Sequence, residues 1–368
     1  MTIQPSPSAQ VRLIKEVLEA GLCSGCGACL GLCPYLAFSK DRVVILNDCD
    51  GQEGRCYSFC PKIPTDLDAL QQSLFDPQDL TPELGPVKDF YLTRAADGQV
   101  RPRAQHGGTV TALMALALEE GFIDTAILVK GGAGLTSQAV AVNRPEEVVE
   151  AAGSKLVVAP VIEKFNQAAQ GPAQKIGLVA LPCQALALAK MRTKPFSPDD
   201  EGIDKLKLVI GLFCGWALAW RPLLELVKAE FGPEELTGLD IPPSKYHCLE
   251  VSTSKSKRRI SLDQVFPCVR ESCQYCQDMT SEFSDISVGS ARLPQGWEEA
   301  RNWNQVLVRT ETGQDLMDLA RQSGRLEFGD MPQGNLDRLK KAAQAKKDRG
   351  LEQLSARTVA LETATQTG

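Results

Sequence analysis

The chain has 368 residues, of which 43% are hydrophobic and 23% are charged, and its formal net charge is −6. This length suits two or three domains of ordinary globular composition, and the negative charge argues against nucleic acid as the main partner. No apolar run reaches the roughly 20 residues that a membrane-spanning helix needs, and the polar first residues do not resemble a signal peptide. We therefore expect a cytoplasmic protein without a membrane span.

Cysteine is the residue type that sets this composition apart, with 13 in the chain. The number is odd, no secretion signal precedes the cysteines, and several are separated by only two residues. In a cytoplasmic chain, such spacing is typical of metal binding rather than of disulfide bonds.

The first predicted element is a short amphipathic helix at residues 11–20, ending before Gly21. It leads into a tight run of four cysteines followed by Pro34, with two, two and three residues between them: Cys23, Cys26, Cys29 and Cys33. This pattern is typical of a ferredoxin-type 4Fe-4S module, because Gly25 and Gly27 let the backbone wrap closely around a cubane cluster. A structural zinc site or inert buried thiols are the alternatives.

A second, incomplete half of the module follows, ending in Cys60-Pro61. In two-cluster modules the last cysteine of each half serves the other cluster. The first cluster would then use Cys23, Cys26, Cys29 and Cys60, and the second would use Cys33, Cys49 and Cys56. A standard second motif has cysteine where this chain has Gln52. Asp48, Asp50 or a distant cysteine is therefore a candidate fourth ligand, and a three-iron cluster or no second cluster is the alternative.

Beyond residue 88 the pattern changes to strands that alternate with helices. Three strands are predicted at residues 125–130, 175–181 and 206–214, and three helices at residues 109–120, 184–191 and 218–231. This alternation favours an α/β domain with a mixed, largely parallel sheet. We expect four parts: a ferredoxin-type domain at 1–65, a polar, Pro-containing linker at 66–88, an α/β domain at 89–330, and a charged helical tail at 331–368.

A second group of cysteines lies in the α/β part. Cys183 and Cys214 end two predicted strands, where sites collect in parallel sheets. Cys268, Cys273 and Cys276 follow later in the chain. Five cysteines from three places are enough for another four-thiolate site, and spacing alone prefers Cys268 to Cys214. Buried inert thiols, a zinc site and a redox dithiol are the alternatives.

Several motifs together resemble the beta subunits of coenzyme deazaflavin hydrogenases and dehydrogenases. They are Pro182-Cys183-Gln184, Gly211-Leu212-Phe213-Cys214-Gly215, Cys273-x2-Cys276-x-Asp278, Asp285-Ile286-Ser287-Val288-Gly289-Ser290, Gln105-His106-Gly107-Gly108-x2-Thr111 and Gly153-Ser154-Lys155. The resemblance extends from Leu22 to about Gly296, and relatives include beta subunits of formate dehydrogenases and a reductase of a chlorophyll intermediate. It implies FAD, a 4Fe-4S cluster in the α/β domain, and often an N-terminal two-cluster domain.

The resemblance also assigns residues to these cofactors. It implies Cys183, Cys214, Cys273 and Cys276 as the ligands of the α/β-domain cluster. The flavin candidates are Gly107, Gly108, Thr111, Gly153, Ser154 and Lys155. A helix that begins after Gly108 would hold the FAD pyrophosphate at its positive end, and Lys155 would face phosphate or the flavin ring. An ordinary loop and a solvated lysine are the alternatives.

The remaining polar features are weaker signals. His106 lies inside the flavin motif, where a proton donor and a structural residue are equally reasonable, and we interpret His247 as structural. The basic run at 255–259 indicates a solvated hairpin, and docking of an acidic partner is the alternative. The helix expected at 335–349 is interpreted as a solvated or partner-docking face.

These features together predict an electron relay with two to three 4Fe-4S clusters and FAD. A soluble hydride carrier, either a deazaflavin coenzyme or NAD(P)H, would exchange electrons through the chain with another redox subunit. That subunit would resemble hydrogenase, formate dehydrogenase or heterodisulfide reductase. A wiring subunit without its own substrate site and a direct reductase of an organic substrate are the alternatives.

Overall fold

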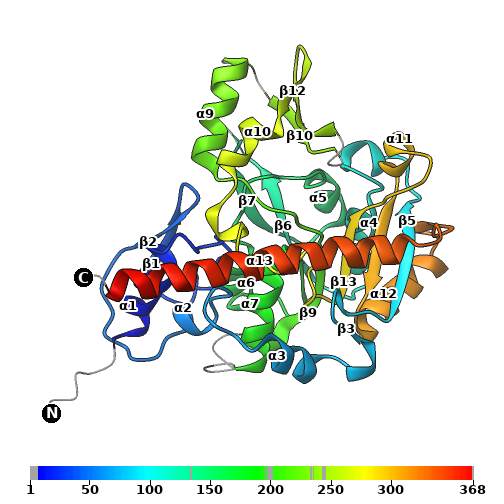
Figure 1. Cartoon of the computed structure of the whole chain (residues 1–368). Helices are drawn as coiled ribbons and strands as arrows, with labels where there is room; N and C mark the ends of the chain where they lie inside the picture. Colours follow the sequence, from blue (N-terminus) through cyan, green and yellow to red (C-terminus); the bar gives the residue numbers. More distant parts are fainter. Residues whose placement is uncertain are drawn as a thin grey trace.

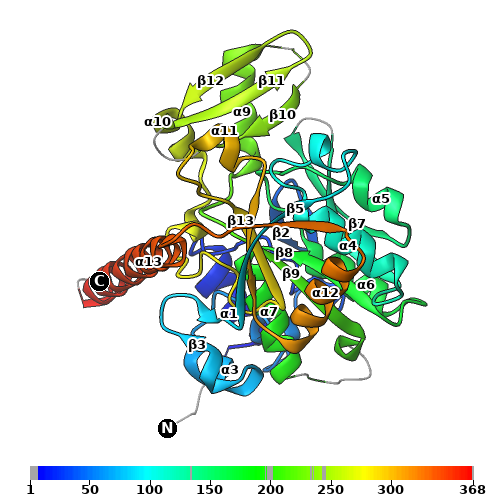
Figure 2. The same ribbon diagram turned by 90° about the vertical axis from the view of Figure 1, so that its right-hand side faces the viewer.

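The computed structural model describes residues 7–132, 135–194, 196, 202–232, 234, 236–242 and 246–366. An eight-stranded sheet with helices on both faces forms the centre (Figure 1). A small cysteine-rich module lies beside it, and a three-stranded sheet with its own helices stands apart at one end (Figure 2). None of the helices in the described part is long and apolar enough to cross a membrane.

The N-terminal module is built from short elements around its cysteines. They are α1 (Ala9–Leu13), a π-helical turn η1 (Ile14–Leu18), the hairpin of β1 (Leu36–Ser39) and β2 (Arg42–Ile45), and α2 (Arg55–Ser58). The predicted first helix is confirmed, and it begins slightly earlier because the Ser8 side chain accepts the Val11 N–H. Gly21, with a φ of 70°, turns the chain into the cysteine loop.

Residues 66–88 are packed, which differs from the predicted linker. They form α3 (Leu67–Leu74), the 3-10 turn η2 (Pro77–Asp79), and the paired β3 (Leu80–Thr81) and β4 (Gly85–Pro86). Leu84 is fully buried beside Leu307. The buried Arg309 donates to the carbonyls of Leu84 and Pro86 at 2.7 Å each, and this fixes the segment to the central sheet.

The central sheet has the strand order β15-β5-β14-β13-β9-β8-β6-β7. Its strands are β5 (Asp89–Ala95), β6 (Thr125–Gly131), β7 (Ser137–Val142), β8 (Ile176–Ala180), β9 (Leu206–Leu212), β13 (Ile286–Ser290), β14 (Asn304–Val308) and β15 (Leu326–Gly329). The three predicted strands are confirmed as β6, β8 and β9. Only the central four strands, β13, β9, β8 and β6, pair in parallel. The outer pairs are antiparallel, so the sheet is mixed rather than largely parallel.

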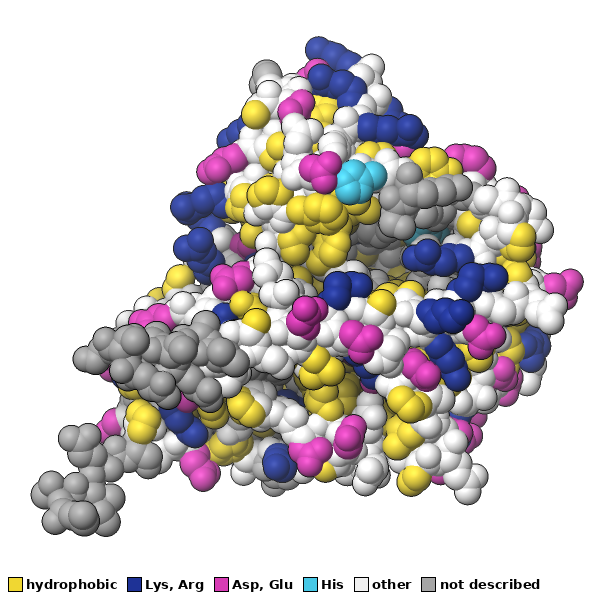
Figure 3. All heavy atoms as spheres, in the orientation of Figure 1, with side chains coloured by type: hydrophobic (Ala, Val, Ile, Leu, Met, Phe, Trp, Pro, Cys, Tyr) yellow, Lys and Arg dark blue, Asp and Glu magenta, His cyan; other side chains and the backbone are white. Residues whose placement is uncertain are grey.

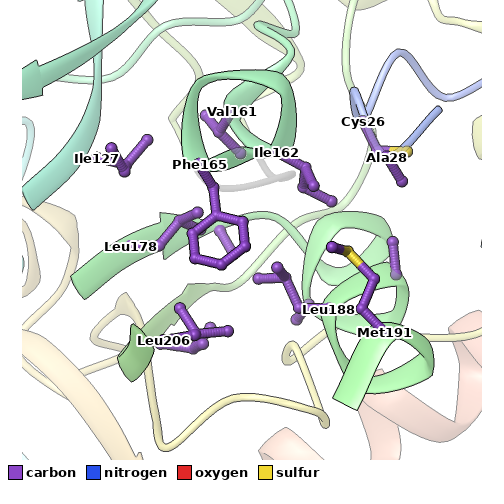
Figure 4. Close-up of a cluster of buried hydrophobic side chains, with 14 of the residues drawn as sticks. Cys26, Ala28, Ile127, Val161, Ile162, Phe165, Leu178, Leu188, Met191 and Leu206 are labelled. Carbon is purple, nitrogen blue, oxygen red and sulfur yellow. The ribbon is translucent and has the colours of Figure 1, made fainter. Parts of the chain in front are cut away.

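Helices cover the two faces of this sheet with separate hydrophobic cores. One face packs against α4 (Thr109–Glu119), α5 (Pro145–Glu150) and α12 (Glu311–Gln322). The other packs against α6 (Val161–Ala169), α7 (Pro182–Thr193) and α3, with Phe165 at the centre (Figure 4). Cys26 and Ala28 of the N-terminal module lie next to Ile162 at the border of this second core, so the module shares a core with the sheet domain.

A smaller unit follows β9. It contains α9 (Trp220–Phe231), the antiparallel strands β10 (Leu236–Asp240), β11 (Cys248–Thr253) and β12 (Lys257–Ser261), and α10 (Leu262–Val265). The predicted solvated hairpin is confirmed, because the basic run forms the turn and the exposed strand β12. Lys257 and Arg259 of this strand pair with the buried Glu250.

The chain ends in a long helix, α13 (Asn335–Gln366), which follows the short α11 (Trp297–Ala300) and the sheet strands β14 and β15. It crosses one side of the molecule from the sheet towards the N-terminal module (Figure 1). Leu339 and Ala343 are buried against Leu307. The helix therefore packs on its own chain, whereas the sequence suggested a solvated or partner-docking face. Acidic and basic side chains are mixed on the surface along it (Figure 3).

Candidate cofactor sites

The candidate residues of the sheet domain gather at one edge of the central sheet. Strand β5 runs in the same direction as β6, β8, β9 and β13, because both β5 and β13 pair antiparallel with β14. The carboxyl ends of these five strands therefore meet at one edge, the usual place for sites in such sheets. Cys183 follows β8, Cys214 follows β9, and the loop with Gly107 and Gly108 follows β5.

The four thiols predicted for the first cluster, Cys23, Cys26, Cys29 and Cys60, line one cavity of the N-terminal module. Cys56 lines the same cavity, and apolar side chains from α1, η1 and β2 complete its walls. Gly27 adopts a φ of 91°, and an added Cβ would lie 2.8 Å from the amide nitrogen of Glu163. A side chain at this position would push the loop away from α6, so glycine is required here.

The electrostatics of this cavity suit a cluster with a cationic iron–sulfur core. Burial first, and then the neighbouring thiolates of Cys60 and Cys23, raise the pKa of Cys26 to about 12. The pKa of Cys29 is raised for the same reasons. Thiolates are the ligands of iron–sulfur clusters, and bound iron would supply the positive charge that reverses these shifts. The donor set therefore fits a 4Fe-4S cluster.

Cys56 also groups with the two remaining thiols of the module, Cys33 and Cys49. The pKa of Cys56 is raised to about 11, mainly by burial and then by Cys33, with Cys49 contributing. Gln52 is exposed, and its carbonyl accepts from Arg12 at 3.3 Å. Asp48 and Asp50 are also exposed. The structure thus groups the three predicted cysteines of the second cluster, and their fourth partner stays an open prediction.

A second cavity, lined by four thiols, lies at the carboxyl edge of the sheet. Its lining includes Cys183, Cys214, Cys273 and Cys276, together with Lys62 and Lys346. Cys268 lies elsewhere, within the hydrophobic cluster of the three-stranded unit that also contains Leu218. The fold therefore groups Cys214 with the other three thiols, and the preference for Cys268 from spacing is not what the structure brings together.

Local hydrogen bonds explain the roles of two residues in the cysteine motifs, Gln184 next to Cys183 and Asp278 near Cys276. Gln184 accepts the Leu181 N–H at 2.7 Å and donates to the Ala159 carbonyl at 2.9 Å, which fixes the start of α7 at Cys183. The Asp278 carboxylate accepts the backbone amides of Thr280, Ser281 and Glu282, and so holds the loop after Cys276. Both motif residues therefore fix the backbone next to a thiol.

The two thiol-lined cavities are neighbours. Ser24, between Cys23 and Cys26 of the first cavity, lines the second cavity as well. The Cys26 thiolate also raises the pKa of Cys183, after burial itself. The module is held in this position by long-range hydrogen bonds: Asn166 donates to the Leu30 carbonyl at 2.7 Å and Lys190 to the Cys60 carbonyl at 2.7 Å. The thiol groups thus lead from the sheet edge into the module.

Eleven of the 13 cysteines fall into these three groups, and Cys248 and Cys268 lie in the three-stranded unit. Within the described ranges, no three His, Cys, Asp or Glu side chains converge closely enough to hold a single metal ion. The thiols line cavities instead.

The first flavin motif is more tightly packed than the sequence suggests. Gly108 caps α4 with a φ of 81°, and the Thr109 N–H donates to Asn304 Oδ1 at 3.2 Å. A Cβ on Gly107 would lie 2.9 Å from the same oxygen. The glycines therefore allow close packing against β14, and Asn304 already satisfies one amide of the helix start that was assigned to pyrophosphate. Thr111 is buried in this first turn.

The two flavin motifs nevertheless meet. Ser154 donates a hydrogen bond to Gln105, which in turn donates to Asp240 at the end of β10. His106 is half-buried beside this group. Its partial burial first, and then nearby Arg301, lower its pKa to about 4, and Asp240 opposes the shift. Asp240 and Arg301, 3.7 Å apart, were not found from the sequence because neither belongs to a recognisable spacing pattern.

Lys155 is half-buried rather than solvated. Its ammonium donates to the carbonyls of Ala151, Ala152 and Gly153 at 2.6, 2.9 and 2.7 Å. Burial, and then the positive charge of Lys130, lower its pKa to about 8. The Lys130 ammonium already pairs with Glu150 at 3.0 Å. Lys155 has no such carboxylate among the three hydrogen-bond partners named above, so a bound anion would stabilise its charged form, and this part of the donor set fits a pyrophosphate or a reduced flavin.

Comparison with known protein families shows which family the chain is related to. Residues 90–165 match the coenzyme F420 hydrogenase/dehydrogenase beta subunit N-terminal domain, and residues 173–333 match the C-terminal domain of the same family. The chain belongs to this family. It is an oxidoreductase of the F420 hydrogenase/dehydrogenase beta-subunit type, and the resemblance inferred from the motifs is confirmed.

Individual relatives are named F420-dependent redox proteins. The beta subunit of coenzyme F420 hydrogenase from Methanothermobacter thermautotrophicus is 28% identical over 74% of this chain and 96% of its own length. One of the subunits of the F420H2 dehydrogenase from Methanosarcina mazei is 24% identical over 91% of this chain and 92% of its own. Coenzyme F420-dependent sulfite reductase from Methanocaldococcus jannaschii is 25% identical over 91% of this chain, which spans 52% of that protein.

A solved structure supports the same relationship. A chain of the F420-reducing [NiFe] hydrogenase complex from Methanosarcina barkeri superposes with a TM-score of 0.68 and 26% identity, covering 75% of this chain and 94% of that chain. The α/β fold is thereby confirmed, and the family supports a redox electron-transfer subunit that works with other redox subunits.

Proposed function

We propose that the chain is an electron-relay subunit that links a soluble hydride carrier to a partner redox enzyme. The carrier would be coenzyme F420 or NAD(P)H, and the partner a hydrogenase, a formate dehydrogenase or a heterodisulfide-reductase-like enzyme. One observation carries the proposal: two thiol-lined cavities are neighbours, and a third thiol group continues from them in the N-terminal module. The names of the F420-dependent relatives support the choice of carrier.

The polar residues at the sheet edge would hold the flavin, and the cysteines would hold the clusters. FAD, when bound, supplies the conversion between a two-electron hydride and single electrons that clusters can pass. Lys155, with Ser154 and Gln105, would hold the anionic part of the flavin. His106, neutral at pH 7 because its pKa is about 4, would be a hydrogen-bonding rather than a charged neighbour.

The thiol groups would hold the clusters. Cys183, Cys214, Cys273 and Cys276 would hold the cluster nearest the flavin, and Cys23, Cys26, Cys29 and Cys60 the next. Cys33, Cys49 and Cys56 would hold the outermost one. Short separations between successive centres would then carry single electrons through the module to the partner.

The test is anaerobic purification of the whole chain with iron, acid-labile sulfide and flavin quantified. We expect two to three 4Fe-4S clusters and one FAD, and reduction of the flavin by F420H2 or NADH. Stoichiometric zinc with negligible sulfide would overturn the proposal.

A wiring subunit without flavin is the second candidate. The observation that favours it is the capping of α4 by Asn304, which occupies part of the expected pyrophosphate site. A full set of clusters without flavin, and without any oxidation of F420H2 or NADH by an artificial electron acceptor, would select this alternative.

A further inference from the structure

A buried lysine from the last helix reaches the cavity of the sheet domain. Lys346 lines this cavity together with Cys183, Cys214, Cys273 and Cys276. It is 5% exposed, and its ammonium donates to the Cys214 carbonyl at 2.6 Å. None of the recognised motifs includes it, because it lies 70 residues beyond Cys276 in the sequence.

Burying an ammonium group is unfavourable unless opposite charge compensates it. The groups that face Lys346 are negative when ionised: Cys276, Cys214, Asp278 and Cys273. An ammonium group is positively charged at neutral pH in its ordinary setting. With these groups as its neighbours, its natural counter-charge is the contents of the cavity that it lines.

The helix holds this charge firmly in place. Leu339 and Ala343, about two turns and one turn before Lys346, are buried against Leu84 and Leu307. The next residue, Lys347, pairs with the buried Glu282 at 2.8 Å.

Gly350 fixes the following turn of the same helix. An added Cβ there would lie 2.8 Å from the Cys276 carbonyl oxygen, so the helix touches the cysteine loop directly. Lys346 is thus fixed between a hydrophobic contact on one side and the ligand loop on the other.

We propose that Lys346 raises the reduction potential of the cluster held by this cavity. The inference rests on the proposed function, because it needs a cluster there. One-electron reduction adds one negative charge to a cluster, and a fixed ammonium beside it stabilises the reduced form more than the oxidised form. The electron comes from the hydride carrier by way of the flavin. Helix α13 thereby favours the transfer of electrons from the flavin into the cluster chain.

The test replaces Lys346 by methionine in the full chain, which removes the charge and keeps most of the volume. Lys341→Met is the matched control, since Lys341 is exposed on the same helix. For Lys346→Met, redox titration monitored by electron paramagnetic resonance should show that the equilibrium constant for reducing one cluster falls roughly tenfold. This corresponds to a reduction potential lower by about 59 mV for one electron. The control and the other clusters should keep their potentials.

Two results would overturn the inference. One is a Lys346→Met protein that holds all its clusters and titrates like the unmodified chain. The other arises if methionine prevents cluster assembly: Lys346→Arg should then restore both cluster and potential, and its failure would show a packing role only. Missing clusters in the unmodified chain would instead contradict the proposed function itself.

Discussion

At the scale of single residues, Arg309 is the clearest structural determinant. It is 1% exposed and donates to five oxygens: those of Leu84, Pro86, Ser287 and two of Thr280. Burial lowers its pKa to about 10, although Glu282 and Asp278 oppose the shift. The guanidinium thereby joins β13, residues 66–88 and the loop after Cys276, which carries a predicted ligand.

Replacing Arg309 by methionine should lower the free energy of unfolding by about 3–5 kcal/mol, because buried carbonyls and carboxylates would lose their partner. Urea denaturation of the anaerobic protein measures this. Arg338→Met is the matched control, since Arg338 is exposed on α13 and should cost little. Equal losses for both variants would contradict the role given to Arg309.

Glu282 makes a pH-dependent contribution to stability. Burial, and then the charge of Asp278, raise its pKa to about 7, although Lys347 lies 2.8 Å away. The folded protein therefore binds this proton more tightly than the unfolded chain, whose carboxyl pKa is the ordinary 4.5. Ionised Glu282 therefore lowers the free energy of unfolding. This loss of stability is absent below the unfolded pKa, grows as the pH rises, and is complete above about 7.

Glu282→Gln removes this titration. Relative to the unmodified chain, the variant should gain stability progressively between about pH 5 and pH 7.5, as measured by urea denaturation at each pH. A difference in stability that stays constant over this range would show that Glu282 does not titrate there.

The sequence predicted which cysteines group together, but it did not predict the charged side chains that surround them. Tight spacing is a local signal, so Cys23, Cys26 and Cys29 were grouped correctly from the chain alone. The choice of Cys214 over Cys268 depends on where two strands end relative to each other, and spacing does not report that. Lys346 and Arg309 act from far along the chain, where no local pattern marks them.

At the scale of elements, the strands and helices of the sheet domain were predictable because each is a continuous apolar run. Helix α4 and strand β6 match their predicted ranges almost residue for residue. Residues 66–88 and α13 were recognised as polar, but their few buried side chains, such as Leu84 and Leu339, decide their packing. Polar composition alone does not distinguish a linker from a segment that packs on the protein through a few buried side chains.

The Asp285-to-Ser290 motif illustrates how an element positions a ligand. Its residues from Ile286 onward form the central strand β13, and a Cβ on Gly289 would collide with the Phe213 ring. Phe213 immediately precedes Cys214. The glycine is therefore needed so that the end of β9 can place this thiol in its cavity.

Gly289→Ala should displace Phe213 and lower the free energy of unfolding by about 1–3 kcal/mol, the usual cost of overpacking. Iron and sulfide analysis should also show loss of one cluster. Gly98→Ala is the control, because no atom lies within 4 Å of the position of its added Cβ. A Gly289→Ala protein with full stability and full iron would contradict this account of the motif.

At the scale of the whole molecule, the N-terminal module packs tightly against the sheet domain rather than forming a separate domain. Arg270 pairs with Asp41 and donates to the Cys23 carbonyl at 3.0 Å, and Lys62 donates to the Ser272 carbonyl at 2.9 Å. Cys26 belongs to the same hydrophobic cluster as Phe165. Removing residues 1–65 would therefore expose part of a core, so the electron path is better tested by single substitutions in the full chain.

Cys29→Ala is the substitution that separates the two ends of the proposed relay. Cys29 lines the N-terminal cavity, and neither Ser154 nor Lys155 is among the lining residues of that cavity, so its loss should remove one cluster and spare the flavin. Reduction of the flavin by F420H2 should continue, whereas electron transfer to the co-purifying partner should fall at least tenfold because the path is interrupted. Cys248→Ala is the matched control, since Cys248 is buried in β11, outside the three thiol groups, and should transfer electrons at the full rate. If the Cys29→Ala chain lacked its cluster but still reduced the partner at the full rate, electrons would leave directly from the sheet-domain cavity, and the N-terminal module would have another role.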